Sequence, residues 1–314
     1  GLVILLSASE YNGRVRFHDS AYYFKKQLFA TSLGLGAMYI ISTMNYRFFV
    51  RLAPAAYLLS MLLSTTVLLV GQEINGSKRW LNLGPLSFQP SEFAKVAVIL
   101  FLTWQIENSR RRTDGFWFMC RTMLTLLPIT GLVGSNNLST AIIIFCITMG
   151  LIFIAHPKVK PFLIAAGVGI VLIIIFVMIL SSSLETSSSF RLRRILVWLH
   201  PEDFASGDGY QTIQALYAIG SGGFLGRGLG NSIQKLGSVP EAQNDMIFSI
   251  VCEELGILGG IILLLLFAYL LYRLFFIAQN APDLFGSLMV SGIFIHIALQ
   301  VIFNIAVVLN LMPN

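Results

Sequence analysis

The stretch MIFSIVCEELGILGGIILLLLFAYLLY, residues 246–272, decides the fold class of this chain. It is longer than the roughly 20 apolar residues that a helix needs to cross a lipid bilayer. Its first half contains two adjacent carboxylates, Glu253 and Glu254. Ionisable residues inside a membrane helix are costly and by default functional. The stretch therefore predicts a transmembrane helix whose first half takes part in a polar site.

Similar apolar stretches recur along the chain. They lie near 27–43, 52–71, 92–105, 119–134, 138–155, 161–180, 246–272 and 286–310, with a further fragment at Gly1 to Ala8. This pattern predicts an all-α integral membrane protein, a polytopic helical bundle that forms one domain over residues 1–314. Because the chain starts inside an apolar stretch, we expect its first helix to be incomplete.

The composition supports the same class. The chain of 314 residues is 56% hydrophobic and 11% charged, whereas soluble domains are about 45–50% apolar and about 25% charged. So few charges do not solvate a globule of this size, which argues against a soluble enzyme, a disordered chain and a nucleic-acid binder. The three scattered cysteines form neither a CxxC pair nor a disulfide framework.

The connections differ in charge. Nine Lys or Arg and only three Asp or Glu belong to one set, namely 44–51, 106–118 with Arg121, 156–160 and 273–285. Short basic connections face the cytoplasm in membrane proteins. The stretches 72–91, 135–137 and 181–244 are then expected outside.

The outer stretch 181–244 is too long for a plain connection. It passes from serine-rich to basic and aromatic, and ends glycine-rich. Within it, Gln211 to Leu225 is a candidate re-entrant element, because irregular backbone at membrane depth is tolerated beside protein or a water-filled cavity.

A first polar motif combines 75–82 with the sequence Gln89 to Lys95. Pro90 and Ser91 indicate a helix start, so Glu92 and Lys95 lie three residues apart on one helix face. One interpretation is an interfacial ion pair with Lys95 extended toward water. The other, which we favour, is the wall of a polar cavity that receives an anionic head group.

A second motif is the run 220–230, which contains six glycines. Its backbone N–H groups could hold phosphate oxygens, although the spacing is not that of a dinucleotide-binding loop. The alternative is a loop in which glycines permit close backbone packing.

A third motif carries three carboxylates. Asp245 stands at a helix start, where a cap contributes about 1 kcal/mol. With 100° per residue, Asp245 and Glu253 are about 80° apart around the helix, and Glu254 lies opposite Asp245. We therefore expect Glu254 to pair with a neighbouring helix. Cations that could serve these sites are Lys95, Arg79, Arg193, Arg194 and Lys235.

Together these motifs resemble the SEDS family, the shape, elongation, division and sporulation proteins FtsW, RodA and SpoVE. Pro240-Glu241-Ala242 is slightly closer to FtsW or SpoVE, and the chain departs from the family pattern at Asn244, at Met246 and over 135–140. The resemblance is carried by Asn75-Gly76, Arg79-Trp80, Gly84-Pro85, Gln89 to Glu92 with Lys95, Gly209-Tyr210-Gln211, Ser221 to Gly223, Gly226 to Gly228, Gln234-Lys235, Pro240-Glu241, Asp245, Ile247-Phe248 and Glu253 to Gly256.

The resemblance implies a ten-helix bundle, of which this chain holds about nine and is truncated at both ends. It implies a peptidoglycan glycosyltransferase that polymerises lipid II at the outer face of the bacterial cytoplasmic membrane during division, elongation or sporulation. The implied partners are a class B penicillin-binding protein transpeptidase, other division or elongation proteins and membrane lipids, with no nucleic acid. No cofactor is evident, and a divalent cation stays open.

The resemblance places the catalytic aspartate on Asp245 and the membrane-embedded pair on Glu92 and Lys95. Asp245 is expected to act as general base in one inverting displacement. Lys95, with Arg79, Arg194 and Lys235 as candidates, is expected to meet the leaving pyrophosphate. Further substrate-binding residues are expected in the motifs, at Trp80, Gln211, Ser221, Gly222, Gly223 and Glu241.

The alternative function is a lipid II flippase or another proton-coupled transporter, because intramembrane Glu and Lys residues would serve a carrier equally well. A carrier should spread ionisable groups across the membrane depth. Here the unusual polar motifs belong to the expected outer side, which favours the glycosyltransferase.

Overall fold

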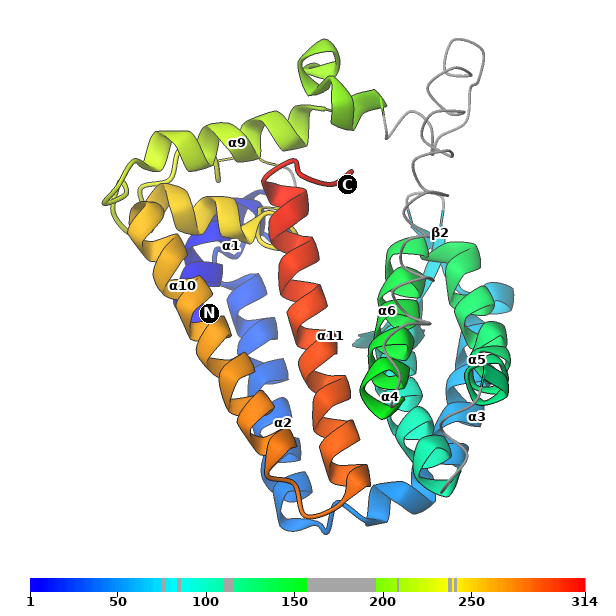
Figure 1. Ribbon diagram of the computed structural model, residues 1–314. Coiled ribbons are helices and arrows are strands. Elements are labelled where there is room, and N and C mark those ends of the chain that lie inside the picture. Colours follow the sequence, from blue (N-terminus) through cyan, green and yellow to red (C-terminus); the bar gives the residue numbers. More distant parts are fainter. Residues whose placement is uncertain are drawn as a thin grey trace. The chain divides into compact units, whose positions relative to one another are not determined.

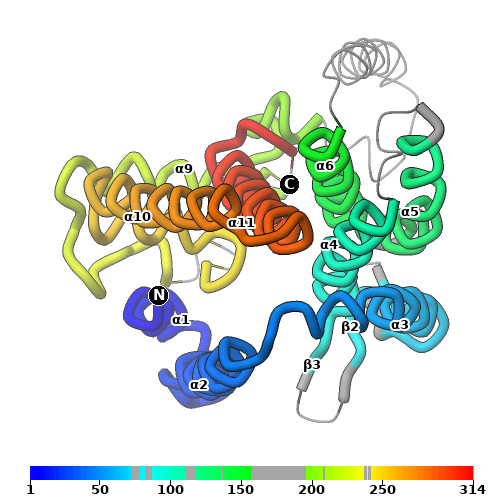
Figure 2. Tube along the Cα trace, turned by 60° about the horizontal axis from the view of Figure 1, so that its bottom comes forward, coloured from blue at the N-terminus to red at the C-terminus, as the bar shows by residue number. Residues whose placement is uncertain are grey.

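The computed structural model describes residues 1–74, 77–83, 86–109, 116–156, 196–207, 209–236, 239 and 242–313. The chain divides into two compact units (Figures 1 and 2). Unit 1 consists of Gly1–Thr43, Leu172–Tyr269 and Val301–Asn314, and unit 2 of Met44–Val171 and Leu270–Gln300. The expected span near 161–180 lies outside the described residues, as do Arg194 and Glu241.

Unit 1 begins with two helices, α1 (Leu2–Phe17) and α2 (Tyr22–Thr43). The sequence analysis expected the first helix to end with the apolar fragment, near Ala8. Helix α1 continues for nine more residues, so this expected end was wrong. The polar half of α1 remains helical with the help of an ion pair between Arg14 and Glu10, 3.0 Å apart at i,i+4 spacing. The helix ends where His18 adopts a left-handed conformation, with φ of 54°.

Helix α9 (Tyr210–Gly222) occupies the place of the candidate re-entrant element. In Figure 1 it runs across the direction of the long part of α10 (Ile247–Gln279). Its buried residues recur at three- and four-residue intervals, as expected of an amphipathic helix; they are Thr212, Ala215, Ala218 and Gly222. With 13 residues, α9 is too short to cross a bilayer, and its insertion into the membrane stays a prediction.

Helix α10 is broken at Gly256, where φ is 71° and ψ is −175°. A Cβ at this position would clash with the carbonyl oxygen of Phe224, so glycine is required both by the backbone angle and by the space. The break frees carbonyl groups that a regular helix would use. The carbonyls of Glu253 and Glu254 accept the N–H groups of Arg227 and Gly228, at 3.0 and 2.9 Å. The glycine-rich run is therefore bonded directly to the break in α10.

Unit 2 is built around α4 (Pro90–Asn108), which packs against α3 (Phe48–Val70), α5 (Phe116–Asn136) and α6 (Leu138–Ala155). Small side chains give α4 its close packing, since Ala94 and Ala97 are both fully buried. Residues 284–300 of α11 (Leu284–Val308) also contact this bundle, because a Cβ at Gly292 would overlap the side chain of Ile99.

A small antiparallel sheet connects α3 to α4, with the order β1 (Gln72–Ile74), β2 (Ser77–Leu83), β3 (Leu86–Phe88). Trp80 is opposite Gln72, and Leu81 is opposite Phe88. The sequence analysis expected only helices and missed these strands. The dipeptide Asn75-Gly76, which lies between β1 and β2, is the strongest short hairpin signal in a sequence and could have predicted them.

Two of the connections expected on one side of the membrane, 44–51 and 273–285, contact each other in unit 2. Tyr46 Oη and Arg47 Nε donate to Asp283 Oδ2, at 2.9 and 3.2 Å. Arg121 Nη2 likewise donates to Ser109 Oγ at 2.8 Å. The contact between 44–51 and 273–285 is compatible with the predicted alternation of sides, which stays a prediction. Five helices of the described residues are long and apolar enough to cross a membrane, namely Phe48–Val70, Phe118–Ser135, Leu138–Ala155, Ile247–Gln279 and Leu284–Val308.

Candidate functional site

Asp245 precedes α10 and is exposed, while its neighbour Met246 is fully buried in the apolar core of unit 1. Asn304 of α11 donates from Nδ2 to the backbone carbonyl of Asp245 at 3.3 Å. The buried neighbour and the hydrogen bond from Asn304 thus hold the backbone at Asp245, while the residue itself stays exposed. This geometry suits a group that must reach a substrate from a fixed position.

Glu253, expected to share a helix face with Asp245, is fully buried and bonded within the protein. Its carboxylate accepts a hydrogen bond from Ser232 Oγ and another from the backbone N–H of Ile233 at 3.0 Å. The Arg227 guanidinium lies 3.7 Å away. With these partners, Glu253 fixes residues 227–233 against α10.

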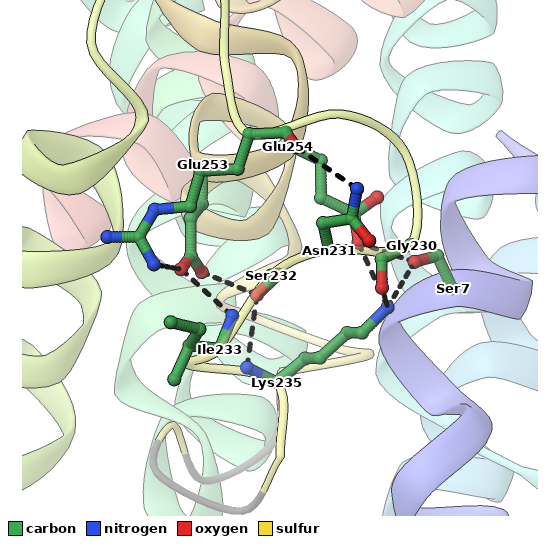
Figure 3. A network of polar contacts seen from close by, with 9 residues as sticks. Ser7, Gly230, Asn231, Ser232, Ile233, Lys235, Glu253 and Glu254 are labelled. Carbon is green, nitrogen blue, oxygen red and sulfur yellow. Dashed lines mark hydrogen bonds and ion pairs between the residues drawn. The ribbon is translucent and has the colours of Figure 1, made fainter.

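Glu254 is also fully buried and forms an ion pair with Lys235, with Nζ and Oε1 3.1 Å apart (Figure 3). The same oxygen accepts a hydrogen bond from Ser7 Oγ on α1 at 2.5 Å. The expected pairing of Glu254 with a neighbouring helix is confirmed through Ser7, and the loop residue Lys235 is added. One network therefore joins α1, the loop and α10.

The ammonium of Lys235 has three donors, and three partners lie within hydrogen-bond distance in Figure 3. These are Glu254 Oε1, Ser7 Oγ at 2.7 Å and the carbonyl of Gly230 at 2.8 Å. Lys235 is only 4% exposed. A contact between Lys235 and pyrophosphate stays a prediction, and it would require this network to open.

Several N–H groups of the glycine-rich run donate hydrogen bonds to backbone carbonyls of the protein. Gly226 N–H donates to the carbonyl of Gly222 at 2.9 Å, and a Cβ at Gly222 would clash with the carbonyl of Cys252. These contacts support close backbone packing as the role of these glycines. Ser221 is half-buried and donates to the Ala218 carbonyl at 3.1 Å, and Gly223 is exposed. Substrate contacts at Ser221, Gly222 and Gly223 stay predictions.

In unit 2, Lys95 lies inside the bundle with only 1% of its surface exposed. Its ammonium is 2.9 Å from Glu92 Oε2, and it donates to Gln300 Oε1 on α11 at 3.3 Å. The Glu92 side chain is 50% exposed. Lys95 therefore does not extend toward water, as one interpretation of the sequence proposed, and Glu92 is the accessible member of the pair.

Other predicted residues lie around these two clusters. Arg79 and Trp80 are half-buried on β2, and Gln211 is half-buried in the first turn of α9. The sequence analysis did not select Asn304 or Gln300, although each is a polar amide on a strongly apolar helix, and that contrast was the available signal. In the part of the chain that the structure describes, no three His, Cys, Asp or Glu side chains form a metal-binding group.

Known proteins with similar sequences cover the whole chain. The sequence pattern of a family described as cell cycle protein, FtsW, RodA and SpoVE, matches residues 1–314. Stage V sporulation protein E of Bacillus subtilis (strain 168) is 36% identical, over 100% of this chain and 84% of that protein. The probable peptidoglycan glycosyltransferase FtsW of Trichlorobacter lovleyi is 32% identical, over 100% of this chain and 81% of that protein.

Solved structures share the fold. A chain from the study "Structural coordination of polymerization and crosslinking by a peptidoglycan synthase complex" aligns with a TM-score of 0.78 and 27% identity, over 100% of this chain and 87% of that chain. The rod shape determining protein RodA of Thermus thermophilus aligns with a TM-score of 0.64 and 27% identity, over 98% of this chain and 82% of that chain. The predicted all-α membrane fold is confirmed.

Proposed function

This chain belongs to the family of cell cycle proteins FtsW, RodA and SpoVE, and on that premise we propose that it polymerises lipid II into glycan strands as a peptidoglycan glycosyltransferase. The relative from Trichlorobacter lovleyi carries the name of this activity. The function also accounts for a site inside a membrane protein, because the donor is a disaccharide linked through pyrophosphate to a long lipid.

We propose that Asp245 is the general base. The 4-hydroxyl of the acceptor sugar attacks the anomeric carbon of the donor, and its proton passes to the Asp245 carboxylate. A bond forms between that oxygen and the anomeric carbon, and the bond between the carbon and the pyrophosphate oxygen breaks. The lipid pyrophosphate leaves with the bonding electrons. One such displacement inverts the configuration and needs one base rather than the two close carboxylates of a retaining glycosidase.

One observation carries this assignment. Asp245, Glu253 and Glu254 lie within ten residues of each other, but only Asp245 is exposed. Glu253 and Glu254 are 0% exposed and already accept hydrogen bonds from residues of unit 1. A general base must reach the proton that it abstracts, so Asp245 is the carboxylate of this segment that suits the role.

The leaving pyrophosphate develops negative charge, which fixed cations stabilise. We propose Lys95 for this role, with Glu92 orienting its ammonium at 2.9 Å. Because Lys95 is buried, this contact requires the pair to open toward the substrate. Arg79 and Arg194 remain candidates on the strength of their motifs. The proposal includes no resident cofactor; dependence on a divalent cation is the alternative, and polymerisation with and without EDTA would decide it.

We further propose that the chain works at the outer face of the bacterial cytoplasmic membrane with a transpeptidase of the class B penicillin-binding protein type. Support comes from the similar chain whose study is titled after coordination of polymerization and crosslinking in one complex. Co-purification of the two proteins from membranes would test the partnership.

The decisive experiment replaces Asp245 with asparagine. Asparagine keeps the size and the hydrogen-bonding oxygen of the side chain but does not take up a proton. We expect Asp245→Asn to fold and insert as the parent does, and to polymerise purified lipid II about 100- to 10,000-fold more slowly, the usual contribution of a positioned base. Asp245→Glu should keep a small part of the activity, since its carboxylate is displaced by one methylene.

Glu10→Gln is the matched control, because Glu10 is an exposed carboxylate in unit 1 whose partner is the exposed Arg14. It should polymerise at the parent rate. If Asp245→Asn also does so, Asp245 has only a structural role, and the transporter alternative then requires a lipid II translocation assay.

A further inference from the structure

Unit 2 contains a small pocket where the ends of α3, β2, α4, α5 and α6 meet, and Lys95 is not among the residues that line it. Apolar side chains of α3 and α5 form part of its wall. Its polar lining consists of Ser64, Lys78, Arg79, Ser91 and Asn137. Of these residues, only Arg79 was selected from the sequence, and it was assigned to the leaving pyrophosphate together with Lys95.

Ser64 gives the clearest indication of a ligand. The residue is 5% exposed, and its hydroxyl has no hydrogen-bond partner among the described residues. A buried hydroxyl without a partner costs about 1–3 kcal/mol, so a ligand oxygen at this position would recover that free energy. Ser91 is 9% exposed and accepts a hydrogen bond from Gln89 Nε2 at 3.0 Å, which leaves its own O–H to donate elsewhere.

The charged residues of the pocket indicate the sign of the charge that its ligand would have. Lys78 and Arg79 are the charged residues among those that line the pocket, and both are cations. The N-terminal turns of α4 and α6 are opposed by the C-terminal turns of α3 and α5, so helix dipoles largely cancel here. The side chains therefore favour an anion, and hydroxyl and guanidinium donors suit phosphate oxygens.

The neighbouring surface indicates that this anion is part of a lipid. Leu69 and Val70, at the end of α3, are each 75% exposed, and Leu138, next to Asn137, is 56% exposed. Such residues lie against acyl chains when the helices stand in a bilayer. A ligand that fits both features has a phosphate group at the level of the helix ends and an apolar chain beside them.

We propose that this pocket binds the phosphate group of a membrane lipid, with Lys78, Arg79 and the Ser64 hydroxyl as its ligands. Two sources share this chemistry: a bulk anionic phospholipid and the lipid-linked donor of the reaction. With the donor as the source the inference rests on the proposed function, and with a phospholipid as the source it does not. Binding is measured without turnover in either case, so a failure of the two proposals can be distinguished.

The test measures lipid binding to the detergent-purified full chain by native mass spectrometry. The probes are phosphatidylglycerol and diacylglycerol with the same acyl chains. We expect the parent to retain phosphatidylglycerol in preference to diacylglycerol. Ser64→Ala should bind it about 10-fold more weakly, the usual loss of one hydrogen bond to a charged group. Lys78→Gln combined with Arg79→Gln should weaken binding further.

Two variants are matched controls and should bind as the parent does. Ser9→Ala removes another buried, unpartnered hydroxyl, but in unit 1, and Arg121→Gln removes an arginine that contacts Ser109 in unit 2. Equal binding by Ser64→Ala and Ser9→Ala, or equal retention of diacylglycerol, would overturn the proposal. Competition by undecaprenyl pyrophosphate would support the donor as the source, and its absence with binding intact would support the phospholipid.

Discussion

Each unit of the molecule contains a Lys–Glu pair, and the two pairs differ in burial. In unit 1, Lys235 and Glu254 are 19 residues apart, one in a loop and one on α10, and their side chains are 5% and 0% exposed. In unit 2, Lys95 and Glu92 are three residues apart on α4, and their side chains are 2% and 50% exposed. The same chemical pair is therefore enclosed in one place and half open in the other.

The difference separates scaffold from site. Two buried charges that form an ion pair hold their secondary-structure elements together, but neither side chain is accessible to a substrate. A pair with one exposed carboxylate keeps a buried cation oriented while still presenting charge to water. Perturbation of the enclosed pair should therefore lower stability, and perturbation of the open pair should lower activity with little loss of stability.

The largest effect on stability is expected for Lys235→Met. It leaves the Glu254 carboxylate buried without its counter-charge, which typically costs about 3–5 kcal/mol. Thermal unfolding in detergent should show a correspondingly lower midpoint and a smaller yield of folded protein. The double variant Lys235→Met with Glu254→Gln should regain much of that loss, because no isolated charge remains. A double variant as unstable as the single one would contradict the role assigned to the pair.

A smaller and asymmetric effect on stability is expected for the open pair. Lys95→Met replaces a buried cation with an apolar side chain of similar size, and Glu92 can turn to water, so stability should change by less than about 1 kcal/mol. Glu92→Gln leaves the Lys95 ammonium buried without its counter-charge, with the amide oxygens of residues 92 and 300 as partners. It should cost more than Lys95→Met, about 2 kcal/mol. The free energy of unfolding measured for both variants would resolve this order.

Both variants of the open pair should nevertheless polymerise lipid II more slowly than the parent. If the two residues act as one unit, the double variant should be no slower than the slower single variant. Parent-like rates in both single variants would remove the pair from the substrate site.

The sequence was sufficient for features that depend on composition and local spacing. Long apolar stretches located α3, α5, α6, α10 and α11, and the i,i+3 spacing predicted the contact of Glu92 with Lys95. The sequence did not reveal the break at Gly256, because a glycine inside an apolar stretch is equally consistent with a continuous helix. It also did not reveal that Glu253 accepts hydrogen bonds from Ser232 and Ile233, some twenty residues away in the chain.

The predicted cations show the same limit. Lys95, Arg79 and Lys235 were equivalent in the sequence as positive charges near polar motifs. The structure gives them different surroundings, since Lys95 is paired with an exposed carboxylate, Arg79 lines a pocket, and Lys235 is enclosed by three partners. Tertiary packing determines how far each of these side chains is buried. We infer from that burial whether a cation is available to a ligand or stabilises the fold.

A third ion pair, in which the cation rather than the carboxylate is exposed, extends the comparison and should show the smallest effect. Arg47 and Asp283 are 3.1 Å apart, with side chains 68% and 18% exposed. Burial acts to raise the pKa of Asp283, but the N–H of Gly286, the Tyr46 hydroxyl and Arg47 outweigh it and hold this pKa below its ordinary value of 3.8. The folded state therefore favours the carboxylate, and this stabilisation is present above pH 3.8 and lost as the pH falls through the folded pKa.

Asp283→Asn isolates the charge, because asparagine can still accept the Gly286 N–H at the start of α11. We expect the variant to be less stable than the parent at pH 7 by less than about 1 kcal/mol, the usual limit for an exposed pair. The difference in unfolding midpoint should shrink as the pH is lowered below 3.8 and through the folded pKa, since the parent carboxyl then becomes protonated in both states. A difference that stays constant over this range would mean that Asp283 acts only through its hydrogen bond to the Gly286 N–H. The proposed relation between the burial of an ion pair and its effect on stability would then not extend to Arg47 and Asp283.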